Sequence, residues 1–338
     1  MVAGLEASGE GLALDQVELW QSRLDALLMR AGEHVLRREA RIQLHDYAKG
    51  LLGQVGRKNT WQIAEHVGHA TSDGLQRLLA RAVWDPEKER DTVRDYVIEH
   101  LGAADGVLIV DETGFVKKRT TSAGVGRQYT GTSGKVDNCQ LAVFAAYPSH
   151  RGRALVDREL YLPKSWMDDP ERCRAAGIPD GREFATKPQI ARFLLTRLVE
   201  AGMPARWVAA DEAYGQDYRF RRALEQLGVG HVLAVPKSQQ VRTFGATRRM
   251  DELIRVAGTR WAIEECFQAA KNKTGLDQYE VCRYPGWYRH LALAMLAQAF
   301  LAAQAAEAAE KGATAVINPW SSTCQWERSG GSRRLSVC

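Results

Sequence analysis

The sequence has few cysteines and no paired-cysteine motif. Its 338 residues contain six cysteines, none of which forms a Cys-x-x-Cys pair, and no His-x3–5-His partner is present. This pattern argues against a zinc ribbon or zinc finger. Scattered cysteines in a chain of this length fit a reducing compartment, so we expect a cytoplasmic protein.

The sequence also lacks a visible targeting segment, a membrane span and an internal repeat. The first residues, MVAGLEASGEGLALDQ, have neither the basic region nor the apolar stretch of a signal peptide. The longest apolar run, residues 291–306, is interrupted by Gln298 and Gln304 and is shorter than a bilayer requires. We therefore expect a packed helix there and no contact with a membrane.

Acidic residues are missing from two basic stretches. The net charge is only +5, but residues 113–135 contain Lys117, Lys118, Arg119, Arg127 and Lys135 with no acid. Residues 236–250 are likewise basic without an acid, whereas residues 1–100 have more acids than bases. The distribution suits a polyanion held near these segments. Ordinary solvated loops are the alternative interpretation.

The first hundred residues have helical periodicity. After a loose start at residues 1–14, apolar residues recur at three- and four-residue steps through residues 14–52. Two shorter helices are predicted, at 61–67 and after the capping residues Ser72 and Asp73, with Gly68 in the turn. The pair resembles a DNA-binding helix-turn-helix, although helical bundles contain similar pairs. We predict an all-helical domain at residues 1–102.

Residues 103–311 predict an α/β domain. Strands are expected at residues 107–110, 139–147, 154–161, 207–210 and 231–235. Helices are expected at residues 187–201, from after residue 212 to residue 226, at 251–273 and at 288–310. Three consecutive strands followed by alternating helices and strands is the topology of ribonuclease H, also found in retroviral integrases. Residues 312–338 are polar and aperiodic, and an irregular tail is predicted.

Two of these buried strands are followed by acids. Asp111 and Glu112 come after residues 107–110, and Asp211 and Glu212 come after residues 207–210. Acids at the carboxyl ends of neighbouring strands lie where α/β folds keep their sites. Clustered carboxylates repel one another unless a cation joins them, and their oxygens suit Mg²⁺ or Mn²⁺.

Alternation along a strand points Glu112 and Glu212 away from their predecessors, so they are second-choice ligands. A helix N-cap or a solvated turn is the alternative role for either aspartate.

A third acid is expected from a helix at residues 259–271. Arg260, Glu264 and Lys271 are four and seven residues apart, so they share one stripe of an α-helix. Glu264 could then reach a metal ion while Arg260 and Lys271 hold phosphates. The other interpretation is a solvated stripe of ion pairs.

Several segments together resemble a known family. They include VLIVDETGFVKKRTTSAGVGRQYTGTSGKVDNCQ, AADEAYGQD and RWAIEECFQAAKNKTGLDQYEV, and the similarity spans residues 30–310. The chain resembles bacterial insertion-sequence DDE transposases with the Tyr-x2-Arg-x3-Glu-x6-Lys signature, in particular the seven-zero-one branch. The signature's arginine, glutamate and lysine fall on Arg260, Glu264 and Lys271, whereas Ala257 occupies the tyrosine position.

The resemblance implies a fold, a reaction and partners. It implies an RNase-H-like core with an N-terminal helical DNA-binding region, and Asp111, Asp211 and Glu264 as catalytic residues that bind two Mg²⁺ or Mn²⁺ ions. Double-stranded DNA would be the substrate, contacted by Arg260, Lys271, Lys117, Lys118 and Arg119, and a homodimer would bridge two transposon ends. The expected reaction is cut-and-paste transposition at terminal inverted repeats in the bacterial cytoplasm.

Two departures from the family leave other functions open. Relatives have a long strand-rich insertion before the glutamate helix, but residues 237–255 leave little room for it, which predicts an internal deletion. The tail lacks the basic helical pattern of relatives, which predicts a frameshift. A catalytically impaired remnant that only binds DNA, and a stand-alone RNase-H-like nuclease, are therefore the alternatives to a transposase.

Overall fold

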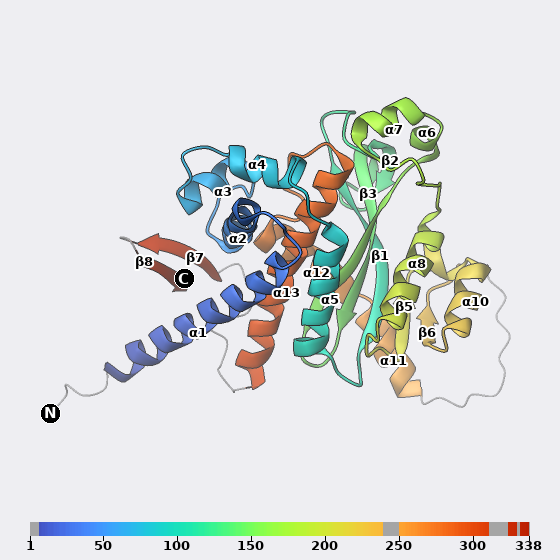
Figure 1. Ribbon diagram of the computed structural model, residues 1–338. Helices are drawn as coiled ribbons and strands as arrows, with labels where there is room; N and C mark the ends of the chain where they lie inside the picture. Colours follow the sequence, from blue (N-terminus) through green and yellow to red (C-terminus); the bar gives the residue numbers. More distant parts are fainter. Residues whose placement is uncertain (1–6, 239–249, 311–323, 330–331, 338) are drawn as a thin grey trace.

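The computed structural model describes residues 7–238, 250–310, 324–329 and 332–337 of the chain. N-terminal helices are followed by a mixed sheet that has helices on both faces (Figure 1). The predicted mixed α/β fold is confirmed at this level, and the sheet is consistent with an RNase-H-like core.

Five helices form the N-terminal part: α1 (Ala7–Gly32), α2 (Arg38–Leu52), α3 (Thr60–Val67), α4 (Asp73–Ala80) and α5 (Pro86–Leu101). The prediction of a loose segment at residues 1–14 is wrong from Ala7 onward, because α1 already begins there. The helical pattern predicted over residues 14–52 is confirmed, and it comprises the two helices α1 and α2. Periodicity continues across the break because both helices bury apolar faces in the same core.

Helices α3 and α4 lie on either side of the predicted glycine turn. The Asn59 side chain accepts a hydrogen bond from the Gln62 amide and caps α3, and Gly68 ends that helix with a φ of 84°. Helix α4 begins at the predicted position, although the Ser72 side chain makes no capping hydrogen bond. Leu75 and Leu78 are buried, as their spacing predicts. DNA contact by this pair stays a prediction.

The sheet has six strands: β1 (Val107–Val116), β2 (Gly126–Thr130), β3 (Lys135–Pro148), β4 (Arg153–Tyr161), β5 (Trp207–Ala210) and β6 (Gly230–Leu233). Strand β3 is antiparallel to β1, β2 and β4, while β5 and β6 run parallel to β1. Strand β1 was predicted to end at residue 110 and β3 to begin at residue 139, but both are longer. Their mutual pairing over residues 109–116 and 139–146 explains the extension of β1.

Among the residues that the structure describes, eight helices complete the α/β part: α6 (Lys164–Met167), α7 (Pro170–Ala176), α8 (Lys187–Glu200), α9 (Glu212–Gly215), α10 (Tyr218–Gln226), α11 (Met250–Thr259), α12 (Ala262–Thr274) and α13 (Tyr284–Glu310). Helices α8 and α10 cover one face of the sheet, and α12 and α13 cover the other (Figure 1). The helix predicted over residues 251–273 is interrupted between Thr259 and Ala262, which separates α11 from α12.

Helix α13 is the packed helix expected from the apolar run. It is long and apolar enough to cross a membrane, but 78% of its most apolar window is buried inside the protein. It packs against α2, α4, α5, α12 and β4. These contacts are those of a helix packed inside the protein.

The helical region and the sheet share one hydrophobic core. Buried residues of α2 and α4 belong to the same cluster as those of β1 and β3. Charged side chains add to the junction, since the fully buried Arg158 of β4 donates to Glu87 of α5 at 3.0 Å. The boundary predicted at residue 102 falls between α5 and β1, at a place where the two parts are closely packed.

The described part of the tail forms an antiparallel hairpin of β7 (Cys324–Ser329) and β8 (Ser332–Val337). The predicted irregular structure at 312–338 is therefore wrong for these two segments, because backbone pairing can form without an apolar alternation. The other tail residues lie outside the described residues. The internal deletion predicted near the junction of Ile254 and Arg255 stays a prediction; this junction lies in α11, and residues 239–249 before it lie outside the described residues.

Candidate functional site

Asp111 lies inside β1 at the point where its parallel neighbour ends. The last pair of the β1–β5 ladder joins Val110 to Ala210, so Asp111 and Asp211 follow it side by side. Asp111 was expected at a strand end but is paired on its other side with Phe144 of β3. Pairing with β3 therefore fixes the backbone of Asp111 on one side, while its other side, beyond the last residue of β5, is open.

Asp211 also caps a short helix. Its Oδ1 atom accepts a hydrogen bond from the Ala213 amide at 2.9 Å, in the N-cap position of α9. The capping role considered for this residue is real. An ionised carboxylate has about four lone-pair sites, so capping and ligand binding do not exclude each other.

The carboxylates form one electrostatic cluster. Burial, followed by repulsion from Glu112, Asp211 and Glu264, raises the pKa of Asp111 to about 8. Burial and Glu112 also raise the pKa of Asp211, while nearby Arg260 opposes the rise. Asp111 is only 9% exposed and accepts no salt bridge among the described residues. A cation is the partner that such a cluster lacks.

Glu264 lies inside helix α12, whereas Arg260 lies before its first residue. Glu264 is exposed in the first turn of α12, where the helix dipole favours a carboxylate. Arg260 precedes α12, so the predicted continuous stripe from Arg260 to Lys271 is wrong. The interruption before Ala262 removes the helical register on which the stripe depended. Arg260 lies near Asp211 instead, since its charge acts on that carboxylate.

Lys271 lies on the same side of the sheet as the carboxylates. Its Nζ atom donates to Thr113 Oγ1 at 2.9 Å and lies 3.4 Å from Thr132 Oγ1. Burial lowers the pKa of Lys271, whereas the charges of Asp277 and Glu264 oppose that effect. Because Thr113 is two residues beyond Asp111 in β1, this hydrogen bond holds the ammonium group of Lys271 at the edge of the acidic cluster.

Of the three basic residues that follow β1, Lys117 is partly buried, whereas Lys118 and Arg119 are exposed. Lys117 Nζ lies 3.4 Å from the centre of the Tyr279 ring, and burial lowers its pKa to about 8. The DNA contacts predicted for these three residues stay predictions, and the geometry favours Lys118 and Arg119 for phosphates.

Glu112 is held by two partners that sequence reasoning missed. Its carboxylate accepts hydrogen bonds from Lys187 Nζ at 2.5 Å and from the Tyr214 hydroxyl at 2.7 Å. Lys187 begins α8 and Tyr214 lies in α9, so Glu112 ties both helices to β1. The separation of these residues along the chain left no local signal for the contact.

Replacement of Tyr214 by phenylalanine is expected to lower the free energy of unfolding by about 1–2 kcal/mol, because Glu112 loses a hydrogen bond to its charged carboxylate. Urea denaturation would measure the change. Tyr218→Phe is the matched control, since Tyr218 is exposed on neighbouring α10. Equal stabilities of both variants would show that the Tyr214 bond has no net value.

The donor chemistry of the cluster fits a hard divalent cation. Asp111, Asp211 and Glu264 offer carboxylate oxygens, the ligands that Mg²⁺ and Mn²⁺ prefer. Within the described part of the chain, no three His, Cys, Asp or Glu residues are already close enough to hold a metal ion. The structure therefore does not bring Glu264 into a ligand cluster with the two aspartates, although its charge acts on Asp111.

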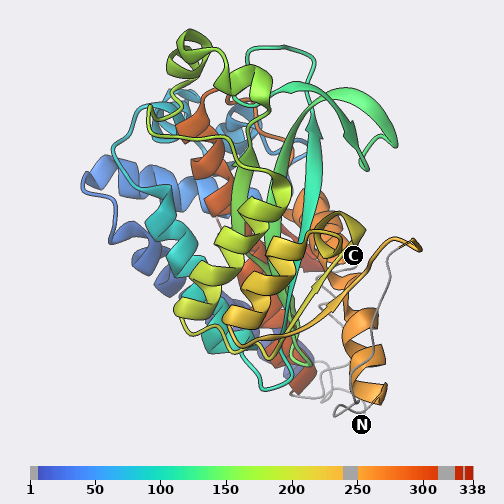
Figure 2. The ribbon, with the colours of Figure 1, turned by 90° about the vertical axis from the view of Figure 1, so that its right-hand side faces the viewer.

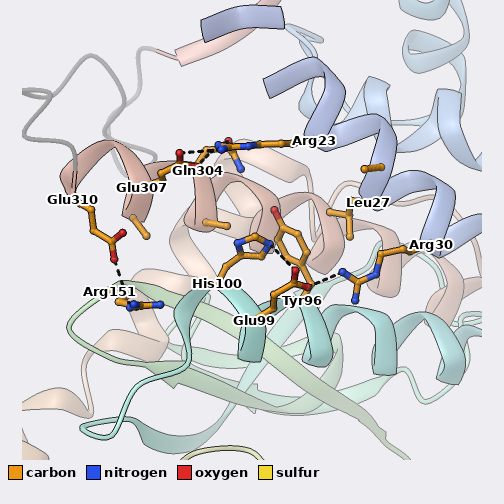
Figure 3. Close-up of a pocket in the computed structure, with 13 residues that line it drawn as sticks. Arg23, Leu27, Arg30, Tyr96, Glu99, His100, Arg151, Gln304, Glu307 and Glu310 are labelled. Atoms are coloured by element: carbon orange, nitrogen blue, oxygen red, sulfur yellow. Dashed lines mark hydrogen bonds and ion pairs between the residues drawn. The ribbon is translucent and has the colours of Figure 1, made fainter. Parts of the chain in front are cut away.

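A separate cavity of about 610 Å³ lies between α1, α5 and α13. It contains none of the predicted site residues. Its walls carry ion pairs of Arg23 with Glu307, Arg30 with Glu99, and Arg151 with Glu310 (Figure 3). Because these charges compensate one another, the cavity offers no unbalanced charge to a ligand, and we assign the site to the carboxylates.

Comparisons with known proteins identify a family and a relative. Residues 31–252 match the profile of a family described as DDE superfamily endonuclease. The match includes Asp111 and Asp211 but ends before Glu264. A similar curated protein is the probable transposase for insertion sequence element IS701 of Microchaete diplosiphon, 32% identical over 194 residues. The aligned part covers 57% of this chain and 48% of the relative, so the chain spans about half the length of that protein.

Proposed function

The chain belongs to the DDE superfamily of endonucleases, and from this premise we propose that it is a transposase that cuts and joins DNA at terminal inverted repeats. The observation that carries the proposal is the register of β1 and β5, which sets Asp111 beside Asp211. Glu264 adds its charge to the same cluster. The similarity to an insertion-sequence transposase supports the choice of DNA as substrate.

The metal chemistry of the proposal follows from the carboxylates. Asp111, Asp211 and Glu264 would hold two Mg²⁺ or Mn²⁺ ions, which supply an activated water or 3′-hydroxyl and stabilise the leaving oxygen. Asp111, whose pKa burial raises, would bind these ions as its deprotonated carboxylate. Its backbone, fixed by pairing to β3, positions the carboxylate without cost at the moment of reaction.

The cations beside the cluster would hold the substrate. Arg260 near Asp211 and Lys271 near Thr113 suit phosphates on either side of the scissile bond. Two copies of the chain would bridge the two transposon ends, and the reaction would take place on DNA in the bacterial cytoplasm.

The deciding experiment is an assay with the purified chain, Mg²⁺ and the DNA ends that flank its gene. Strand cleavage at the repeat boundary supports the transposase. Binding without cleavage would identify a DNA-binding remnant, and cleavage of an RNA–DNA hybrid without repeat specificity would identify a stand-alone nuclease. Mg²⁺ removal by chelation should abolish cleavage in the first and third cases.

Arg260→Ala and Lys271→Ala are each expected to weaken binding to DNA ends and to lower the log–log salt slope by about one unit, because each removes one phosphate contact. Fluorescence anisotropy at several salt concentrations measures the slope. Arg222→Ala is the control, since Arg222 is exposed on α10 at the opposite face of the sheet. Slopes equal to that of the control would mean that neither cation touches phosphate.

A further inference from the structure

The hairpin of β2 and β3 exposes an aromatic and an apolar side chain among basic ones. Tyr129 is 64% exposed and Val136 is 51% exposed, and the two are cross-strand partners. Arg127, also exposed, precedes Tyr129 by two residues and therefore lies on the same face. The hairpin curls away from the body of the sheet (Figure 2).

The register places this face on the same side of the sheet as Asp111. Asp111 and Phe115 point to one side of β1, and Phe115 is paired with Gln140 of β3. Tyr279 confirms the shared side, because its hydroxyl donates to Gln140 and its ring packs 5.7 Å from that of Phe115. Val136 is four residues before Gln140 in β3, so by alternation its side chain lies on the same side of the sheet. Tyr129, its cross-strand partner, therefore also lies on the side of Asp111.

Hydrogen bonds hold the turn between β2 and β3 close to the part of β1 that contains Asp111. The Thr132 hydroxyl donates to the Gly114 carbonyl at 3.0 Å, and Lys271 lies between Thr113 and Thr132. A Cβ atom at Gly114 would lie 1.9 Å from Thr130 Oγ1, so the hairpin touches the backbone of β1 here. The exposed face is thus held at a fixed place relative to Asp111.

Positive charge surrounds the two exposed side chains. The Asn138 amide donates to the carbonyls of Lys117 at 2.6 Å and Arg119 at 3.1 Å, which holds the exposed Lys118–Arg119 segment against the hairpin. Asp137 is the one acid of residues 126–139, and alternation turns it to the opposite face. Cations that follow a phosphate backbone, combined with an aromatic ring, are the means by which proteins bind single strands.

We propose that this hairpin face, formed by Lys118, Arg119, Arg127, Tyr129 and Val136, holds the DNA strand that leaves the carboxylate cluster. The cations contact phosphates, and the Tyr129 ring stacks on an unpaired base. The inference rests on the proposed function, because it takes Asp111, Asp211 and Glu264 as the place where the strand is cut.

The test measures DNA binding without cleavage, in EDTA, on a blunt duplex and on the same duplex with a short unpaired tail. Tyr129→Ala is expected to bind the tailed duplex about tenfold more weakly, since one stacked base is lost, and the blunt duplex as well as the wild type. Tyr129→Phe keeps the ring and should bind both normally. Tyr218→Ala, which removes an exposed tyrosine on α10, is the matched control.

A second readout reports stacking directly. With 2-aminopurine in the tail, the wild type and Tyr129→Phe should quench its fluorescence, whereas Tyr129→Ala should not. Equal loss of affinity for blunt and tailed DNA, or unchanged quenching, would overturn the proposal. So would a change of oligomeric state in Tyr129→Ala, which would assign the face to a second copy of the chain.

The two proposals fail in different ways. A wild-type protein that neither binds nor cleaves its flanking DNA would refute the proposed function and the hairpin inference with it. A wild-type protein that cleaves, while Tyr129→Ala binds tailed DNA normally, would refute the hairpin inference alone.

Discussion

Asp111→Asn is expected to lower strand cleavage about a thousandfold or more, with DNA binding retained. The amide cannot supply the negative charge that holds a divalent cation, and loss of metal-derived stabilisation of about 4 kcal/mol corresponds to that factor. Asp211→Asn should have an effect of the same size, because Asp211 is the register neighbour of Asp111 at the end of the β1–β5 ladder.

Single-turnover cleavage of the flanking DNA measures this effect. Glu212→Gln is the matched control, since Glu212 follows Asp211 directly but is exposed. Anisotropy in EDTA should give the same affinity for all variants. Cleavage by Asp111→Asn at the rate of the control would remove Asp111 from the metal site.

Without divalent metal, Asp111→Asn is also expected to make the protein more stable, by roughly 3–5 kcal/mol at pH 8. Burial and the neighbouring acids raise the pKa of Asp111 to about 8, whereas an unfolded chain has an ordinary aspartate. The folded wild type must therefore either keep a proton that the unfolded chain has lost, or carry a repelled charge.

The sign of the pH dependence follows from the proton count. Between about pH 4 and pH 8 the folded state binds more protons than the unfolded state, so wild-type stability falls as the pH rises through this range. Asp111→Asn has no carboxyl group at this position, so its stability lacks this contribution to the pH dependence. Urea denaturation at several pH values in EDTA should show the two curves converging below pH 4 and separating towards pH 8.

Metal provides the reciprocal measurement. Mg²⁺ should raise the melting temperature of the wild type, because it binds the folded cluster, and should leave Asp111→Asn nearly unchanged. Glu212→Gln should behave as the wild type. A wild type whose stability is independent of both pH and Mg²⁺ would contradict a repulsive cluster at Asp111.

Most elements could be predicted from local patterns. The short β-branched run at residues 107–110 and the run at 207–210 each marked a buried strand, and both strands are found there. Gly68 marked the turn between α3 and α4 because its φ of 84° suits glycine. Such signals are local, since they depend on propensities and on periodicity within one element.

Other features depended on contacts between distant segments. Strand β1 extends to Val116 because β3 supplies its hydrogen bonds, and the tail hairpin forms by backbone pairing that no apolar pattern announces. Helix α12 begins only at Ala262, so the spacing of Arg260 from Glu264 did not place them on one helix face. The extent of an element reflects its partners as well as its own residues.

The sequence by itself determined which acids follow the two buried strands, since apolar runs ending in Asp111 and Asp211 require no knowledge of the fold. Tertiary structure decided that the two lie side by side, through the parallel register of β1 and β5. It also decided that Lys187 and Tyr214 hold Glu112, and that Tyr129 shares the side of Asp111. Sequence patterns encode burial and backbone preference over a few residues, whereas proximity across a sheet is set by strand pairing between segments far apart in the chain.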